Sequence, residues 1–496
     1  MNLDQLLREI PVLARSGPLP ASVAGLHYDS RQIQPGWAFV AIRGEQVDGN
    51  AYVPQALRQG ATVVVSEQPA PARDLGAAWV QVAQARTALA QAAANFFGRP
   101  AERLRLVGIT GTNGKTTTAW LIEALLRATG VQAGLLGTVE YHIGSEVLPS
   151  PHTTPESYDL QALLARMLAA DCQAAVMEVS SHALAMERVW GCRFEVAVFT
   201  NLTQDHLDYH GTMARYQEAK RRLFTGLGAP PPRAAVVNAD DPASAAMLEG
   251  YGGAVLRYGF GAGADLRASA LVNRPAGATF TLRGPHGFEA EVATLLVGRA
   301  NVLNLLAAIA TGWSLGLERA AAVQGASRLR RVPGRFERVY AGQPFVVLVD
   351  YAHTPDALAN VLGLARELAT GEGATPGRVL VMFGCGGDRD RGKRPLMAQA
   401  AQQGADWVLL TSDNPRSEDP MAIIREALAG VEPGTVLVDA DRASAIRLAL
   451  RTARAGDVVI LAGKGHEAYQ IVGEQRLPFD DVQQARAALG ELGWTL

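Results

Sequence analysis

A strand that runs directly into a glycine-rich loop and then into a helix constrains this chain most. Residues 104–110 read LRLVGIT, residues 111–117 read GTNGKTT, and residues 118–128 continue as TAWLIEALLRA with helical periodicity. Glycines at such a turn let backbone N–H groups surround a phosphate at the start of the helix. The sequence therefore predicts an α/β chain that binds a nucleotide at this P-loop.

The side chains of the loop have expected roles. Lys115 would reach the β- and γ-phosphates, and the Thr116 hydroxyl would bind Mg²⁺. We expect the nucleotide to contact Gly111, Thr112, Asn113, Gly114, Lys115, Thr116 and Thr117. Ile109 stands where a strict GxxxxGK[ST] motif has its first glycine. The alternative is a tight turn that binds no nucleotide.

Composition and charge exclude several other classes of protein. The chain has 46 Lys and Arg against 48 Asp and Glu, a net charge of -2, so it has no overall field that would attract nucleic acid or anionic membranes. No run approaches the roughly 18 apolar residues of a membrane-spanning helix. Acidic residues interrupt the N-terminal segment, unlike a signal peptide. We expect a cytoplasmic monomer that does not bind nucleic acid or insert into membranes.

Breaks in the α/β pattern predict three domains. A helical run ends at Gly98, which predicts an N-terminal domain at residues 1–98. A central P-loop domain with a parallel sheet is predicted at residues 99–332, and a Rossmann-like α/β domain at residues 333–496. In the last domain four apolar strands each precede a polar turn, and ligands of open parallel sheets bind at such strand ends.

Two more strands of the central domain end in polar residues. The segment AAVMEVSSHAL places Glu178 at a strand end, and TNLTQDHLDYH places His206 after another. With Thr116 they could form a site for a hard metal such as Mg²⁺. His206 and His210 have a spacing that could bind zinc, but no HExxH motif accompanies them. Lys220, taken alone, would be part of a solvated charge run.

The motifs together resemble those of the Mur ligases, ATP-dependent amide-bond synthetases of peptidoglycan precursor assembly. The matching segments span most of the chain: HYDSR, GTNGKTT, EVSSHAL, TNLTQDHLDYH, YQEAKRRLF, GRANVLNLLAA, PGRFE, DYAHTPDAL and GKGHEAYQ. Ile109 is normal in that family. The set is most similar to the branch that adds meso-2,6-diaminopimelate to the D-glutamate γ-carboxylate of UDP-N-acetylmuramoyl-L-Ala-D-Glu. That reaction proceeds through an acyl phosphate and releases ADP and phosphate.

The resemblance implies catalytic and metal-binding roles. Lys220 would carry a carbamate derived from CO₂ and would hold one Mg²⁺ together with His206. Thr116 and Glu178 would hold the other Mg²⁺. Lys115, Lys220 and His206 are accordingly the expected catalytic residues.

The resemblance also implies binding residues. Asn301, Arg335 and Asp350 would contact the adenine, phosphate and ribose of ATP; otherwise Asn301 would be a helix cap and Arg335 a surface cation. The muramoyl dipeptide would be held by His152, Thr153, Thr154, Ser180 and Arg188, and the UDP end by Tyr28, Ser30 and Gln46. Met186 and Glu45 depart from side chains that relatives can carry at those positions.

The loop TSDNPRSEDP predicts the third substrate. Diaminopimelate has a second carboxylate that lysine lacks, and a guanidinium such as that of Arg416 binds a carboxylate bidentately. With lysine as substrate this guanidinium would be left unpaired, and the loss of its partner would select strongly against lysine. The residues implied to bind diaminopimelate are Arg389, Asp413, Asn414, Pro415, Arg416, Gly463 and Glu467. The alternative for Asn-Pro is ordinary turn chemistry.

Other functions fit the residues less well. The segment from Gly463 to Ala468 fits a G-x-G-x-x-A dinucleotide motif, but too little chain follows it to build a dinucleotide-binding half-domain. A lysine-adding ligase conflicts with Arg416, and a folylpolyglutamate-type synthetase conflicts with the N-terminal segment HYDSRQIQPGWAFVAI. A nucleotide-switched binding module is the alternative from a different class, because a P-loop alone permits it.

Overall fold

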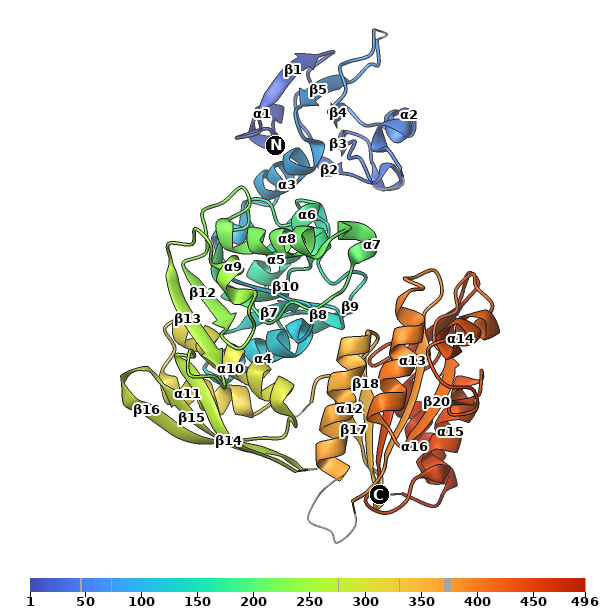
Figure 1. Cartoon of the computed structure of the whole chain (residues 1–496). Helices are drawn as coiled ribbons and strands as arrows, with labels where there is room; N and C mark the ends of the chain where they lie inside the picture. The colour runs from blue at the N-terminus through green and yellow to red at the C-terminus, as the bar shows by residue number, and fades with distance from the viewer. Residues whose placement is uncertain (45–46, 73, 275, 330, 370–375, 496) are drawn as a thin grey trace.

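The computed structural model describes residues 1–44, 47–72, 74–274, 276–329, 331–369 and 376–495. Three α/β bodies follow one another along the chain, each with its own main sheet (Figure 1). The N-terminal body lies at one end of the central body, and the C-terminal body lies beside the central body (Figure 1). Among the described residues, no helix is both long and apolar enough to cross a membrane.

The N-terminal body is built on a five-stranded sheet in the order β1-β5-β4-β3-β2. Strands β2 to β5 pair in parallel, and β1 pairs antiparallel with β5. Helix α3 buries one alanine- and leucine-rich face against this sheet. The elements are β1 (Val12–Ser16), β2 (Gly25–His27), β3 (Trp37–Val40), β4 (Val63–Ser66), β5 (Ala78–Val82), α1 (Leu3–Leu6), α2 (Val53–Arg58) and α3 (Ala85–Phe96).

The central body holds an eleven-stranded sheet in the order β16-β15-β14-β13-β12-β11-β6-β10-β7-β8-β9. Its strands are β6 (Arg105–Thr110), β7 (Ala133–Leu136), β8 (Glu140–Ile143), β9 (Glu146–Pro149), β10 (Ala174–Glu178), β11 (Phe194–Phe199), β12 (Ala234–Asn238), β13 (Ala254–Gly259), β14 (Leu266–Arg274), β15 (Gly277–Gly284) and β16 (Phe288–Thr294). Its helices are α4 (Lys115–Ala128), α5 (Ser157–Ala169), α6 (Ser181–Ala185), α7 (Leu207–His210), α8 (Met213–Thr225), α9 (Ser244–Met247), α10 (Arg299–Ser314) and α11 (Arg319–Ser327).

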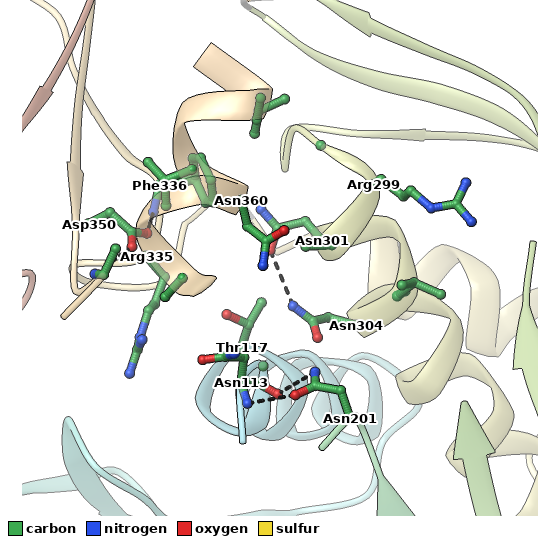
Figure 2. A pocket seen from close by; sticks show the side chains of 18 of the residues that line it. Asn113, Thr117, Asn201, Arg299, Asn301, Asn304, Arg335, Phe336, Asp350 and Asn360 are labelled. Atoms are coloured by element: carbon green, nitrogen blue, oxygen red, sulfur yellow. Dashed lines mark hydrogen bonds between the residues drawn. The ribbon is translucent and has the colours of Figure 1, made fainter. Parts of the chain in front are cut away.

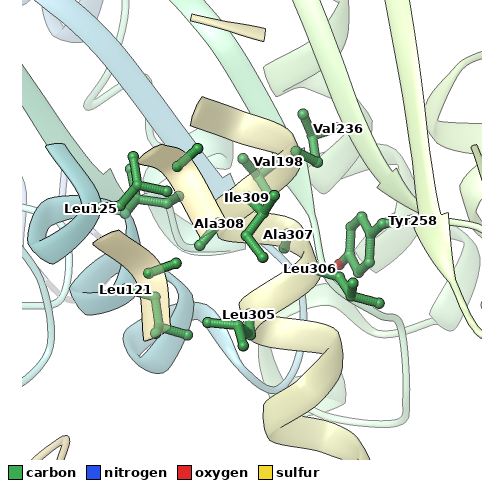
Figure 3. Close-up of a cluster of buried hydrophobic side chains, with 14 of the residues drawn as sticks. Leu121, Leu125, Val198, Val236, Tyr258, Leu305, Leu306, Ala307, Ala308 and Ile309 are labelled. Carbon is green, nitrogen blue, oxygen red and sulfur yellow. The ribbon is translucent and has the colours of Figure 1, made fainter. Parts of the chain in front are cut away.

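Helices α4 and α10 pack together over the middle of this sheet and form its main core. Leu121 and Leu125 of α4 face Leu305 and Ile309 of α10 (Figure 3), and all four are fully buried. Burying one such side chain contributes about 1.5–3 kcal/mol. Because α4 begins at the P-loop and α10 lies against it, this core sets the position of the loop relative to the α10 N-terminus.

The C-terminal body has a six-stranded sheet in the order β17-β18-β22-β19-β20-β21, with a separate β23-β24 hairpin. Strands β18, β22, β19, β20 and β21 run parallel, as the four apolar segments predict, and β17 is antiparallel. The elements are β17 (Glu337–Val339), β18 (Val346–Asp350), β19 (Val379–Cys385), β20 (Trp407–Ser412), β21 (Leu437–Val438), β22 (Val458–Ala462), β23 (Tyr469–Val472), β24 (Gln475–Pro478), α12 (Pro355–Ala369), α13 (Lys393–Gly404), α14 (Pro420–Leu428), α15 (Arg442–Thr452) and α16 (Asp481–Glu491).

The edges of the central sheet differ from the expected parallel arrangement. Strands β14, β15 and β16 form an antiparallel meander, and β7, β8 and β9 form another at the opposite edge. Along β14 and β15 buried residues alternate with more exposed ones. This alternation is typical of antiparallel strands with one solvated face. The expected three-domain α/β class is confirmed, with mixed rather than wholly parallel sheets.

Candidate active site

The P-loop forms the turn between β6 and α4, at the centre of the central sheet. Gly111 and Gly114 have φ values of 151° and 84°. A Cβ on Gly111 would lie 1.8 Å from Thr200 Oγ1, and one on Gly114 would lie 2.4 Å from Asn304 Oδ1. Both glycines are therefore required by conformation and by close packing, and the loop is pressed against β11 and α10.

The hydroxyl of Thr116 lies beside the carboxylate of Glu178. Thr116 Oγ1 donates to Glu178 Oε2 at 3.0 Å, which joins the first turn of α4 to the end of β10. Thr138 donates to the same carboxylate through its backbone N–H at 2.7 Å and its hydroxyl at 3.1 Å. Glu178 is 1% exposed. The structure thus brings two of the predicted metal ligands together as a pair of hard oxygen donors.

Two lysines donate to one carbonyl oxygen of the P-loop. Lys220 Nζ lies 2.7 Å from Gly111 O, and Lys115 Nζ lies 3.0 Å from it. Lys220 is 1% exposed, and its Nζ also lies over the Tyr216 ring, 4.3 Å from the ring centroid. Burial lowers the pKa of Lys220 well below its usual range, and the nearby Lys115 lowers it further. Lys220 is therefore no part of a solvated charge run.

His206 lies at the start of α7 in a left-handed conformation with φ of 53°. Its Nε2 is 3.3 Å from Asp205 Oδ2, and its ring contacts that of His182 edge-on at 4.8 Å between centroids. Partial burial lowers the pKa of His206, opposed by Asp205. His210 instead contacts Ser181 Oγ at 2.9 Å. Within the described ranges, no three His, Cys, Asp or Glu side chains cluster closely enough to hold a metal ion by themselves.

A cavity of about 510 Å³ lies between the P-loop, α10 and the C-terminal body. Asn301 and Asn304 enter it from α10, whereas Arg335 and Asp350 enter it from the opposite side (Figure 2). Asn113 lies on the P-loop side (Figure 2). The volume is in the range of small-molecule sites. The structure therefore brings all three residues expected to bind ATP outside the P-loop to one cavity.

The side chains of this cavity are tied to their surroundings. Asn301 Nδ2 donates to Val297 O at 2.9 Å, a contact at the start of α10. Arg335 Nη2 donates to Thr116 Oγ1 at 3.3 Å, across the two bodies. Both Asp350 carboxylate oxygens accept backbone N–H groups, at 2.8 Å each. Burial raises the pKa of Asp350, opposed by Arg335.

A second cavity, of about 550 Å³, opens between the central body and the polar turns of the C-terminal sheet. His206, Asp205 and His182 line it from the central body. The C-terminal body contributes six residues that the sequence predicts to bind diaminopimelate: Arg389, Asp413, Asn414, Arg416, Gly463 and Glu467. Pro415, the remaining one, is not part of the lining.

Lys464 is not part of the lining of this second cavity but contacts three residues that are, and the sequence reasoning missed it. Its fully buried Nζ lies 3.3 Å from Asp413 Oδ1, 3.1 Å from Asn414 Oδ1 and 3.3 Å from Glu467 Oε2. Burial raises the pKa of Glu467, as does Asp413, while Lys464 opposes them. The sequence feature that could have indicated Lys464 is its position in the motif GKGHE, between two glycines that follow a buried strand.

Tyr351 and His353 line both cavities, and they were also missed. His353 Nδ1 lies 2.8 Å from the carbonyl of Tyr351, so the neutral ring carries its proton on Nδ1 and a lone pair on Nε2. Burial, with the nearby Lys393, lowers the pKa of His353 to about 4. The neutral imidazole therefore offers Nε2 as a hydrogen-bond acceptor at this boundary. Its place in the segment DYAH, after a buried strand, was the available signal.

The residues expected to bind the muramoyl dipeptide lie near Glu178 but outside both cavities. Thr153 Oγ1 is 3.0 Å from Thr138 Oγ1, and Thr154 Oγ1 donates to Glu178 O at 2.9 Å. Ser180 caps α6, and Arg188 donates to Thr154 O at 3.0 Å. His152 is exposed.

The residues expected at the UDP end lie in the N-terminal body. Tyr28 donates to Asp159 of the central body at 2.8 Å, and Ser30 donates to Gln55 at 3.1 Å. Gln46, with its neighbour Glu45, lies outside the described residues. The structure thus spreads the expected nucleotide-sugar residues across the junction of two bodies.

Family models match the chain in the same order as its three bodies. The model described as "Mur ligase family, catalytic domain" matches residues 22–97, "Mur ligase middle domain" matches residues 109–312, and "Mur ligase, glutamate ligase domain" matches residues 334–465. The chain belongs to the Mur ligase family. The resemblance seen in the motifs is thereby confirmed over most of the length of this Mur ligase.

Individual relatives of this Mur ligase are similar over their whole lengths. A protein of Solibacter usitatus is 50% identical, with 100% of this chain and 99% of the relative covered, and is named UDP-N-acetylmuramoyl-L-alanyl-D-glutamate--2,6-diaminopimelate ligase. A protein of Geobacter sulfurreducens with the same name is 46% identical, with 98% of each covered.

Solved structures show the same fold. A structure titled with that enzyme name has a TM-score of 0.70 and 34% identity, covering 100% of both chains. The folylpolyglutamate synthase of Mycobacterium tuberculosis has a TM-score of 0.60 and 20% identity, covering 82% of this chain and 95% of the synthase. This second likeness concerns the fold alone.

Proposed function

We propose that this Mur ligase joins meso-2,6-diaminopimelate to the D-glutamate γ-carboxylate of UDP-N-acetylmuramoyl-L-Ala-D-Glu, with ATP as co-substrate. Relatives with 50% and 46% identity over nearly their full lengths carry the name of this activity. The product would be an intermediate of peptidoglycan biosynthesis in the cytoplasm. A monomer would suffice, because one chain lines both cavities.

One observation carries the proposal: the turn containing Tyr351 and His353 lines both cavities. A nucleotide in the first cavity would have its phosphates at the P-loop. An amino acid in the second cavity would lie against the DNPR loop, residues 413–416. A ligase needs these two ligands side by side, because the carboxylate activated by one must be attacked by the amine of the other. A nucleotide-switched module has no need for the second cavity.

The reaction would proceed in two steps. The γ-phosphoryl group of ATP passes to the D-glutamate γ-carboxylate, while Lys115 turns from the Gly111 and Thr112 carbonyls to the transferring oxygens. ADP leaves in this first step. The neutral diaminopimelate amine then attacks the acyl phosphate and loses a proton, and the tetrahedral intermediate expels phosphate. Asp413 and Glu467 would bind the ammonium group at the far end, and Arg416, with Arg389, would bind carboxylate.

The residues present fit Mg²⁺. Thr116 and Glu178 already form a pair of oxygen donors 3.0 Å apart, the ligand type that Mg²⁺ prefers. His206, with Asp205 beside it, would hold a second ion from the end of β11. When bound, Mg²⁺ supplies positive charge that stabilises the phosphate oxygens.

We further propose that Lys220 reacts with CO₂ to form a carbamate. An ammonium group cannot bind a metal, but a carbamate offers carboxylate-like oxygens. The amine of Lys220 is buried beside Lys115, and both burial and the neighbouring cation disfavour its charged form. A carbamate would remove one positive charge from this crowded position and complete the second metal site with His206.

The decisive experiment measures phosphate release from ATP and Mg²⁺ with UDP-N-acetylmuramoyl-L-Ala-D-Glu and either meso-diaminopimelate or L-lysine. We expect release with diaminopimelate alone, at one ADP for each amide formed, and strongly reduced but measurable release in Arg416→Ala. Equal activity with lysine would refute the role of Arg416. ADP formation that needs neither amino acid would favour a nucleotide-switched module.

A further inference from the structure

The loop that carries Arg416 is packed against a second loop, the turn after β19. Arg416 Nη1 donates to Gly387 O at 2.7 Å, and Gly387 N donates to Asn414 O at 2.9 Å. A Cβ on Gly387 would lie 1.9 Å from Pro415 O, so the two backbones touch. Arg416 itself has φ of 51°, which only its surroundings can maintain. The position of its guanidinium therefore depends on the second loop.

Arg394 and Glu418 fasten the two loops together from behind the cavity. Arg394 of α13 donates to Glu418 Oε1 at 2.7 Å and Oε2 at 3.0 Å, and to Gly386 O at 3.1 Å. Glu418 Oε1 also accepts the N–H of Asp388 at 2.6 Å. Glu426 of α14 accepts a further bond from Arg394 at 2.7 Å. Arg394 thus connects both loops and α14.

The ion pair between Arg394 and Glu418 is largely buried, and its geometry is tightly defined. The Arg394 side chain is 0% exposed and that of Glu418 is 13% exposed. A bidentate guanidinium–carboxylate pair fixes both the distance and the orientation of its two partners. Neither residue lines the amino-acid cavity. Any effect on the substrate must therefore pass through Arg416 and its loop.

We propose that Glu418 and Arg394 are positioning residues that set the selectivity for diaminopimelate over lysine. They fix the position of one loop relative to the other, so that the Arg416 guanidinium faces the second carboxylate of diaminopimelate. The inference rests on the proposed function of the second cavity. Lysine has no second carboxylate, so it gains no contact from this placement.

The test compares Glu418→Gln with Arg391→Gln. Arg391 contacts the same two glutamates at 2.8 and 3.7 Å, but its side chain is 64% exposed, and exposed ion pairs contribute little. We expect Glu418→Gln to raise the KM for diaminopimelate by about tenfold or more with little change in kcat. Lysine should still give no phosphate release, the KM values for ATP and the UDP substrate should stay unchanged, and Arg391→Gln should behave as wild type.

A double-mutant cycle with Arg416→Ala tests the path of the effect. If Glu418 acts through Arg416, Glu418→Gln adds little in the Arg416→Ala background. Full additivity, or an unchanged KM for diaminopimelate in Glu418→Gln, would overturn the proposal. A joint rise of all three KM values would also overturn it, because it would indicate a purely structural role.

Ser417→Ala provides a milder variant in case Glu418→Gln does not fold. Ser417 Oγ donates to Asp388 Oδ1 at 2.7 Å on the exposed side of the same two loops. Its loss should raise the same KM by a smaller factor, and no rise would count against the proposal. Wild-type protein without diaminopimelate-dependent phosphate release would instead refute the proposed function, which separates the two failures.

Discussion

Lys115 and Lys220 meet at one carbonyl oxygen, that of Gly111. Two ammonium groups at such a position repel each other, and burial disfavours the charge of both. Burial lowers the pKa of Lys115, opposed by Glu178 and Asp205. ATP phosphates would draw Lys115 away, and a carbamate would make Lys220 an anion. Each change removes the repulsion between the two ammonium groups.

Replacing Lys220 with Met should lower kcat by about 100- to 1,000-fold, the loss typical when one group that stabilises transition-state charge is removed. Phosphate release measures this effect. Wild-type protein incubated with ¹³CO₂ should show a carbamate signal by ¹³C NMR that the variant lacks. Arg215→Met, an exposed change on the same helix, is the control. A fully active Lys220→Met would contradict both the carbamate and its role.

At the scale of elements, a buried charge cluster joins α4 to the β7–β9 meander. His142 of β8 lies 2.7 Å from Glu123 of α4 through Nδ1 and 2.8 Å from Glu140 through Nε2, and Arg127 lies 2.8 Å from Glu123. Burial alone would lower the pKa of His142, but hydrogen bonds and charges of the two glutamates outweigh it and raise the pKa. The meander leads to the loop that carries Thr153 and Thr154, so the cluster also supports the expected dipeptide site.

The raised pKa of His142 predicts a pH-dependent stability. The protonated ring contributes to the free energy of unfolding. This contribution is fully present below the unfolded-state pKa of about 6.5 and is lost as the pH rises through the higher folded-state pKa. The difference in Tm between wild type and His142→Gln should therefore be larger at pH 6 than at pH 9. Thermal unfolding at both pH values checks this. A Tm difference that is equal at both pH values would contradict a raised pKa of His142 in the folded state.

At the scale of the whole molecule, polar side chains join the N-terminal and central bodies. Arg86 of α3 donates to Glu156 at 3.1 Å and to Arg43 O at 3.2 Å. Glu156 in turn lies 3.5 Å from Arg188, an expected dipeptide ligand. The N-terminal body is thus connected to the peptide end of the site as well as to the UDP end.

Replacing Arg86 with Met should raise the KM for the UDP substrate by about tenfold, because hydrogen bonds to charged groups contribute about 1.5–3 kcal/mol. The KM for ATP should not change, since its cavity lies at the other junction. Arg8→Met, whose side chain is 70% exposed, serves as the control. Steady-state kinetics measures the KM values for the UDP substrate and for ATP. An equal rise of both KM values would contradict a role of Arg86 that is confined to the UDP substrate.

Much of this arrangement follows from local sequence. The P-loop, the four apolar strands of the C-terminal sheet and the DNPR turn each depend on neighbouring residues, and each forms where its pattern predicts. The antiparallel β14–β16 meander was missed, because strand direction depends on which partner each strand meets. Lys464 was missed because a lysine in sequence carries no sign of burial.

The sequence by itself determined the family, the three-domain α/β class and the residue types of each candidate loop, because those depend on residue type and short spacing. Only the tertiary structure decided that Tyr351 and His353 lie between two cavities, that Lys220 shares a carbonyl with Lys115, and that Arg394 joins Gly386 to Glu418. Those facts join residues from separate elements, and the packing of the sheets and helices, rather than any local pattern, sets their distances.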